Sequence, residues 1–285
     1  MKVNYPILQI ILVFCCLCHH LQPVFAGNDK RTLGGKQAAM GNTSVTFTDV
    51  YAVFSNQAGL AGLNNFSAGI YAENRFLLKD LSMFAVALAL PLKRNAGTFG
   101  SGITYFGNSL YNERHINLAY GRKLFKDLSI GIELDYVGIA IADYGSAHAF
   151  TFGIGAQYVF LPKLVGGAHI YNPLRWRFTD FEEDRLPTIV KGGLTYLPSE
   201  ILTIAVEAEK NLDAPMMFKS GIDYRIIEKL SLRAGISTSP FTGTFGIGLN
   251  LGNLKIDFAN SFHPVLGYSP HFGLIYSASK RKSQR

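Results

Sequence analysis

Cysteine is nearly absent from this sequence and confined to one end. The three cysteines all fall in the apolar run "ILQIILVFCCLC" at residues 7–18, which follows Lys2 and precedes "HHLQPVFA". A charged start, an apolar core and a small residue at Ala26 are typical of a cleaved secretion signal, which we predict for residues 1–26. The exported chain then has no cysteine, which excludes disulfide scaffolds, thiolate zinc sites and cysteine nucleophiles.

Long hydrophobic runs, charge blocks and linkers are also missing. No apolar stretch is long enough for a comfortable transmembrane helix, and no Pro/Ser-rich stretch separates two domains. The formal charge of +7 is mild, and the cations are scattered apart from the basic tail at residues 280–285. A nucleic-acid surface would gather basic residues on one face, so we expect no nucleic-acid partner.

Motifs for enzyme chemistry are absent as well. The sequence has no H-E-x-x-H zinc motif and no G-x-S-x-G serine elbow, and the histidines beyond the signal are dispersed. Glu207 and Glu209 share one face of an expected strand, but the basic residues around them favour ion pairing over acid/base chemistry. We predict no catalytic, cofactor-binding or metal-binding residue, and therefore a protein that is not an enzyme.

Beyond residue 64 the sequence alternates apolar and polar residues and shows no sustained helical period. The segment 128–136, for example, puts leucine, isoleucine and tyrosine on one face and small or acidic residues on the other. Alternation with a period of two predicts β-strands. We count about fourteen of them, at residues 66–74, 81–92, 97–106, 113–123, 127–141, 147–160, 163–172, 187–197, 200–210, 216–226, 229–239, 243–251, 253–262 and 270–278.

Strand spacing and link lengths favour a membrane barrel. The strands recur about every 15 residues, which suits membrane strands of about 9–11 residues better than soluble sandwiches that repeat roughly every 8–12. The tight links "LFKD", "LPK", "LPSE", "IEK" and "GN" follow even-numbered strands, whereas the long links "PLRWRFTDFEEDRLP" and "HPVLGYSPH" follow odd-numbered ones. Short periplasmic turns and longer outer loops give an outer-membrane barrel this parity.

A soluble barrel with its apolar face inside would show the same alternation. Three features favour the membrane: the apolar faces carry almost no polar residue, tyrosines recur near their ends, and the other face is rich in glycine and short polar residues. Closure also removes the exposed edges of so long a sheet. We therefore predict an all-β fold, a transmembrane antiparallel up-and-down β-barrel of about fourteen strands over residues 65–279, in the outer membrane.

The stretch from Gly34 to Leu63, "GGKQAAMGNTSVTFTDVYAVFSNQAGLAGL", fits neither a helix nor a strand. Its Met-Gly pair, its aspartate and its Asn-x-Ala-Gly-Leu-Ala run make it similar to the N-terminal segment of the FadL-like outer-membrane barrels, especially the PorV/PorQ branch linked to type IX secretion. The resemblance implies that residues 27–64 form a hatch, or plug, inside the lumen. The plug motif comprises Asn56, Gln57, Ala58, Gly59 and Leu60.

Irregular backbone at membrane depth must be buried in protein or line a wet cavity, which agrees with a lumenal plug. A periplasmic lead-in to the first strand is the alternative. Gln57 stands where the family has proline, so a proline-dependent kink is not carried over. The PorV/PorQ resemblance implies a non-enzymatic accessory or docking role for exported proteins or secretion-machinery components. The alternative is a FadL-like channel for a small or hydrophobic ligand.

Charged residues of both signs lie on the face that we expect to line the lumen. They are Glu133, Asp135, Lys191, Glu207, Glu209, Lys219, Asp223, Arg225, Arg233, Lys255 and Asp257. Two explanations remain open: a polar conduit or ligand site, or ion pairs that fill and stiffen the interior. A selective ion pore would more plausibly show rings of one sign.

The longest expected outer loop contains the only tryptophan, Trp176, between Arg175 and Arg177. Aromatic and arginine side chains often dominate protein interfaces, so this trio could contact a partner protein. The loop could equally fold back over the barrel mouth.

Overall fold

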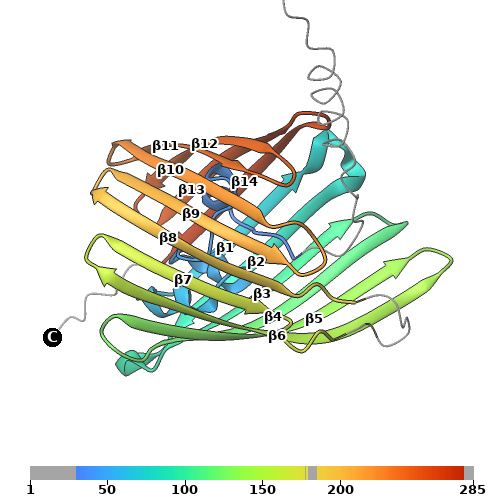
Figure 1. Cartoon of the computed structure of the whole chain (residues 1–285), viewed down its shortest axis with the longest axis horizontal. Helices are drawn as coiled ribbons and strands as arrows, with labels where there is room; N and C mark the ends of the chain where they lie inside the picture. Colours follow the sequence, from blue (N-terminus) through green and yellow to red (C-terminus); the bar gives the residue numbers. More distant parts are fainter. Residues whose placement is uncertain (1–29, 177, 179–184, 279–285) are drawn as a thin grey trace, which may run out of the picture.

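The computed structural model describes residues 30–176, 178 and 185–278. Fourteen antiparallel strands form a closed barrel in which each strand pairs with its neighbours in sequence and β1 pairs with β14 (Figure 1). The strands are β1 (Ser67–Asn74), β2 (Ser82–Pro91), β3 (Thr98–Gly107), β4 (Tyr111–Lys123), β5 (Leu128–Ile141), β6 (Gly145–Leu161), β7 (Leu164–Tyr171), β8 (Ile189–Ser199), β9 (Leu202–Asn211), β10 (Met217–Ile227), β11 (Leu230–Ser237), β12 (Thr242–Leu251), β13 (Leu254–His263) and β14 (Gly267–Ser277). The barrel prediction is confirmed. The expected signal and basic tail lie outside the described residues and stay predictions.

The two faces of the wall are oriented as a membrane barrel requires. On β6, Phe150 and Ile154 point outward with 66% and 48% of their surface exposed. On neighbouring β5, Glu133 and Asp135 point inward and are 0% and 1% exposed. Because the apolar row faces outward around the barrel, hydrocarbon rather than water is the solvent that stabilises it.

The lengths of the links agree in part with the prediction that short links follow even-numbered strands and long links follow odd-numbered ones. The turns at residues 162–163, 200–201, 228–229 and 252–253 all follow even-numbered strands. The longest link, residues 172–188, follows β7. The β2–β3 link contains η5 (Lys93–Asn95), and the β1–β2 link contains η3 (Arg75–Leu77) and η4 (Lys79–Leu81).

The expected long loop after β13 is wrong, because β14 begins at Gly267 and leaves only residues 264–266 between the two strands. Pro270 lies within β14. It is tolerated in β14 because the pairing with β1 ends at His271, so one side of Pro270 has no neighbouring strand that needs its missing N–H.

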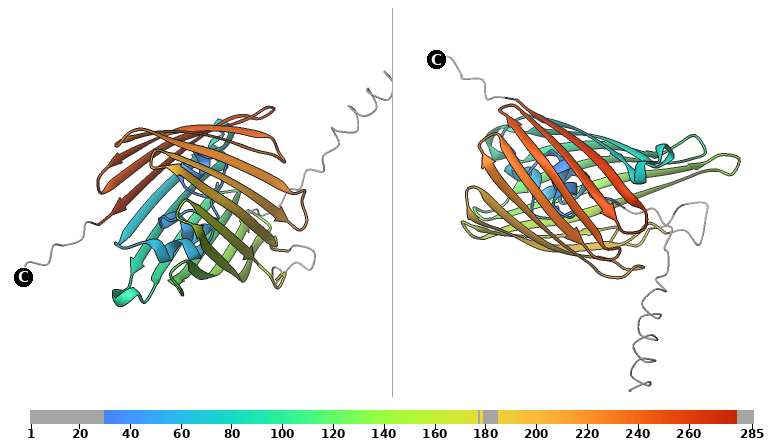
Figure 2. Two further views of the ribbon diagram at one scale, coloured as in Figure 1. Left: turned by 60° about the vertical axis from the view of Figure 1, so that its left-hand side comes forward. Right: turned by 90° about the horizontal axis from the view of Figure 1, so that it is seen from above.

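Residues 34–63 lie inside the barrel rather than in front of it. They contain α2 (Gly35–Ala39), η1 (Val50–Phe54) and η2 (Gln57–Gly62), which Figure 2 shows in blue within the ring of strands. We call residues 34–63 the plug. Among the described residues, no helix is long and apolar enough to cross a membrane.

Local chemistry explains why residues 50–62 of the plug form two short 3-10 turns. Asp49 precedes η1 and accepts a hydrogen bond from the Tyr51 N–H at 2.8 Å. Asn56 precedes η2 in the same way and accepts one from the Ala58 N–H at 3.2 Å. Such side chains end one turn and begin the next, which prevents a continuous helix.

Glycines in the wall let the plug approach closely. A Cβ at Gly102 would lie 2.3 Å from the ring of Phe54, and one at Gly131 would lie 2.3 Å from the plug backbone at Ala58. Both distances are far below van der Waals contact. At these two positions of the inner face the plug packs directly against the strand, and only glycine leaves enough space for it.

Candidate functional site

An ion-pair cluster crosses the lumen wall on β8, β9 and β10. Lys219 lies 3.3 Å from Glu207 and also contacts Glu209, while Lys191 lies 3.1 Å from Glu209. The strand register places Lys191 opposite Glu209 and Lys219 opposite Glu207. Cross-strand neighbours of opposite charge stabilise a sheet, and here they neutralise one another. Glu207 also accepts hydrogen bonds from the Ser44 and Val45 N–H groups at 2.7 and 2.8 Å, which ties the cluster to the plug.

A second cluster joins β10, β11 and β13. Arg233 contacts Asp257 and lies 3.2 Å from Asp223. Asp223 is also 3.3 Å from Lys36, which belongs to α2 of the plug. The wall contributes two carboxylates and one guanidinium to this cluster, and the plug supplies the second cation.

A third cluster lies on β4, β5 and β7 around two buried carboxylates. Glu133 contacts Lys30 and accepts a hydrogen bond from Asn117 at 3.3 Å. Asp135 lies 3.2 Å from His115 and accepts a hydrogen bond from the Tyr171 hydroxyl at 2.7 Å. Buried charges are tolerated where partners of this kind compensate them.

Two of the predicted lumen residues do not join these clusters. Arg225 and Lys255 share the parity of the inward-facing rows but are exposed, close to the end of the barrel that carries the short turns. Arg225 lies two residues before the end of β10, and Lys255 is next to the start of β13. Their exposure shows that water reaches them at this end of the barrel. The other nine predicted residues are buried or nearly so and take part in the three clusters.

The plug motif holds the plug against β6 and β7. The Asn56 amide donates hydrogen bonds to the carbonyls of Val45 at 2.6 Å and Ala156 at 3.1 Å. Gln57 donates to the Val53 carbonyl at 3.1 Å, within the plug itself. Ala58, Gly59 and Leu60 are buried, and a Cβ at Gly59 would lie 2.2 Å from the Phe47 carbonyl oxygen, which explains the glycine.

An apolar cluster fixes the other side of the plug to β1, β2 and β3. Val50, Tyr51, Val53, Phe54 and Leu60 are fully or almost fully buried against small wall residues such as alanines of β2. The Tyr51 hydroxyl donates to the Ile70 carbonyl at 2.6 Å. Burial raises the pKa of Tyr51 well above its usual value, so the hydroxyl stays a hydrogen-bond donor. Burial also raises the pKa of Asp49, although Gln37 donates to its carboxylate at 2.8 Å.

The described start of the loop after β7, residues 172–176, packs against the barrel. The Trp176 N–H of the backbone donates to the Asn172 side chain at 2.9 Å, and the indole ring contacts Phe152 edge to face at 6.0 Å. The indole is nevertheless 43% exposed. Arg175 lies 3.6 Å from Asp213, and Arg177 lies outside the described residues. A contact with a partner protein stays a prediction.

A cavity of about 320 Å³ lies in the lumen at the long-loop end of the barrel. We call it the vestibule. Its polar lining includes Lys30, Arg31, Glu73, Arg75 and His271. Arg75 lies 2.8 Å from Glu73, and the Tyr71 hydroxyl shares a 2.7 Å hydrogen bond with His271.

The vestibule also has an apolar side, to which Phe76, Pro215, Met217 and Pro240 contribute. Sequence analysis missed this cavity, because barrel closure between β1 and β14 is what brings its residues together. The one available signal is the pair Glu73 and Arg75, charged residues with inward parity at the end of the first strand. Within the described part of the chain, no group of three or more histidine, aspartate or glutamate residues is arranged to hold a metal ion.

Comparison with known proteins gives the fold a precedent. No family model matches the chain, and no curated protein matches its sequence. Several solved structures share the architecture. The Pseudomonas putida toluene transporter TodX has a TM-score of 0.65 and 15% identity over 87% of this chain and 98% of its own. A TodX monoaromatic hydrocarbon channel mutant scores 0.68 with 13% identity over 86% of this chain and 98% of its own.

A Pseudomonas aeruginosa FadL homologue scores 0.61 with 12% identity, over 87% of this chain and 96% of its own. At such low identity the likeness shows the fold alone. This chain therefore has a fourteen-strand barrel of the FadL type. The PorV/PorQ branch is not represented among these similar structures.

Proposed function

We propose that this protein is an outer-membrane channel that admits a small molecule through the vestibule and past the plug. The vestibule carries the proposal, because it is a cavity of about 320 Å³ at the long-loop end, directly against the plug segment. Long loops face the exterior in outer-membrane barrels. The similar structures, a toluene transporter and a hydrocarbon channel among them, support transport.

The lining favours a ligand with an apolar body and an anionic or polar group. Phe76, Met217 and Pro215 offer apolar contact, whereas Arg31 and Arg75 offer cations on the same cavity. Arg75 is paired with Glu73 and the Arg31 guanidinium lies over the ring of Phe106, so both cations are held in place at the cavity. Small-molecule sites generally combine an apolar lining with a few polar groups that fix orientation.

The docking role implied by the PorV/PorQ resemblance is less well supported. The similar structures include a hydrocarbon channel and a toluene transporter, and the exposed loop residue Trp176 is partly occupied by its contact with Phe152. Accessory contact with exported proteins therefore stays a prediction from the resemblance.

Flux through reconstituted liposomes tests the transport proposal. We use benzoate as an aromatic anion and glucose as a polar probe that lacks both charge and an apolar ring. Benzoate should enter faster through the native protein than through protein-free vesicles, and deletion of residues 34–63 should increase entry of both probes because the lumen is then open. Arg75→Gln should lower benzoate entry and leave glucose unaffected.

Folding of each variant is checked by heat-modifiable migration on a gel. Absence of flux of either probe through both the native protein and the folded deletion variant would sink the proposal. Capture of exported proteins in that situation would favour docking instead.

A further inference from the structure

The outer face of the barrel carries a trough of small residues where its neighbours are large. Ala156, Ala168, Gly192 and Ala208 are directly paired across β6, β7, β8 and β9 and all face outward. Two hollows of about 740 and 680 Å³ meet at Ala156 and Ala168. They form one continuous depression, which we call the trough.

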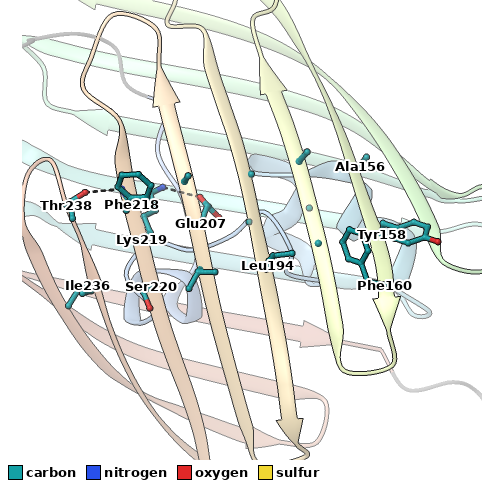
Figure 3. Close-up of a pocket in the computed structure, with 17 residues that line it drawn as sticks. Ala156, Tyr158, Phe160, Leu194, Glu207, Phe218, Lys219, Ser220, Ile236 and Thr238 are labelled. Carbon is teal, nitrogen blue, oxygen red and sulfur yellow. Dashed lines mark hydrogen bonds and ion pairs between the residues drawn. The ribbon is translucent and has the colours of Figure 1, made fainter.

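Larger side chains bound the trough on both sides. The paired row toward the long-loop end contains Ile132, Ile154, Ile170 and Val190. The row toward the short-turn end contains Tyr158, Gly166, Leu194 and Val206. The ring of Phe160 covers the glycine, since a Cβ at Gly166 would lie 2.5 Å from it. In Figure 3 the rings of Tyr158 and Phe160 lie to one side and that of Phe218 to the other, with no labelled ring on the strands between them.

The trough rises obliquely through the membrane. Register continues it to Ile130 and Arg122 at one end and to Phe218 at the other. From Ile130 to Phe218 it crosses five strand intervals, or about 24 Å at about 4.8 Å each. Because the strands tilt by about 40°, this length rises by roughly 15 Å, about half of the hydrocarbon core. That is the depth of one leaflet.

Its low end carries positive charge. Arg122 is exposed, has the outward parity of the lipid-facing row and lies next to the end of β4, at the short-turn end of the barrel. The same turn adds exposed Lys123 and Lys126 against one carboxylate, Asp127. Among the described residues no carboxylate forms an ion pair with Arg122.

We propose that the trough binds one acyl chain of an anionic phospholipid in the periplasmic leaflet, with the phosphate at Arg122. Short turns face the periplasm in bacterial outer-membrane barrels, so a lipid of that leaflet enters the trough with its headgroup at the cationic end and its chain rising toward Phe218. Arginine suits phosphate because its planar fork donates two hydrogen bonds in parallel. A second copy of this chain fits less well, because it would bury Arg122 without a carboxylate. The proposal requires the outer-membrane location but not transport.

Two substitutions, each with its control, test the acyl-chain contact and the headgroup contact separately. Gly192→Leu fills the trough, and a Cβ at Gly192 meets no atom within 4 Å, so the wall accepts it. Gly243→Leu is its matched control, because Gly243 is an equally open strand glycine on β12 outside the trough. Arg122→Gln removes the cation, Arg122→Lys retains the charge, and Arg94→Gln removes another exposed arginine at the same end of the barrel, in the β2–β3 link.

The protein is reconstituted in vesicles of phosphatidylcholine with one tenth phosphatidylglycerol, extracted in mild detergent, and its retained lipid is measured by native mass spectrometry. Native protein should retain phosphatidylglycerol about tenfold above its share in the vesicle, a difference of about 1.4 kcal/mol. Arg122→Gln should abolish the enrichment and Arg122→Lys should restore part of it. Gly192→Leu should reduce retention of both lipids, and Gly243→Leu and Arg94→Gln should match the native protein.

Retention in the same ratio as the vesicle overturns the proposal, as does enrichment that survives Arg122→Gln. A dimer that Gly192→Leu dissociates also overturns it, since the trough would then be a subunit interface. Heat-modifiable migration shows that each variant is folded. None of these readouts involves flux, so failure here leaves the transport proposal untouched, and failure of transport leaves this result intact.

Discussion

Among single residues, Asn56 shows most directly how the plug is attached. It is fully buried, its amide nitrogen donates to the carbonyls of Val45 and Ala156, and its amide oxygen accepts from the Ala58 N–H. One side chain thereby begins η2 and joins the plug to β6. Gly155 makes room for it, because a Cβ there would lie 2.0 Å from the Asn56 amide oxygen.

Asn56→Ala should loosen the plug without unfolding the barrel. It removes a turn-initiating hydrogen bond and leaves a buried N–H without an acceptor, which together cost about 1–3 kcal/mol. The open population of the plug should rise by about 5- to 150-fold. Hydrogen exchange of the amides in η1 and η2 measures that change. Asn253→Ala, in an exposed turn, is the control, and equal protection in the two variants would contradict the assigned role.

At the scale of elements, the plug contains a titratable residue that links its stability to pH. The half-buried carboxylate of Asp49 accepts hydrogen bonds from the Gln37 side chain and from the Tyr51 N–H at the start of η1. Burial raises the pKa of Asp49 above the ordinary value of 3.8. A carboxyl group with a raised pKa binds protons more readily in the packed plug than in the displaced one. Within the window between the ordinary and the raised pKa, the packed form therefore gains stability as pH falls.

Asp49→Asn removes this proton linkage while retaining a side-chain oxygen that can accept from Tyr51. Protection factors of the η1 amides should rise in the native protein as pH is lowered through the raised pKa, and the rise should be smaller in the variant. The difference between the two pH profiles isolates Asp49 from the carboxylates of the wall. Parallel profiles, or a native plug that loosens in that window, would show that the assigned linkage is wrong.

For the whole molecule, the sequence predicts what depends on local periodicity and misses what depends on closure. Strands such as β5 and β6 could be located because apolar residues alternate with small or polar ones along them. The start of β14 could not, because Pro270 is acceptable only where the pairing with β1 has already ended. The vestibule depends on Arg31, Glu73 and His271, which come from distant parts of the chain and meet only when the barrel closes.

Strand register explains the other omissions. Ala156 and Gly192 are unremarkable in sequence, and only the pairing through Ala168 aligns them as a trough. The charged residues of the lumen could be predicted because the alternation of apolar and polar residues shows which side chains face inward. The exposure of Arg225 and Lys255 could not be predicted in this way, because parity shows which face a residue is on but not how accessible that residue is to water.

Whether lipid or water surrounds the outer face distinguishes a membrane barrel from a soluble one. A single charged substitution on that face can test which solvent is present. Val86 lies near the middle of β2, is 48% exposed, and is paired with Ile70 and Ile103 in the outward row. Val86→Arg places a cation in hydrocarbon, which costs about 2–4 kcal/mol near the bilayer midplane. Tyr144→Arg, at an 85% exposed position in the link after β5, should cost about 0–1 kcal/mol. Guanidinium titrations in phospholipid vesicles, followed by heat-modifiable migration, measure both. If water wetted the outer face, Val86→Arg would be harmless, and its free energy of unfolding would equal that of Tyr144→Arg.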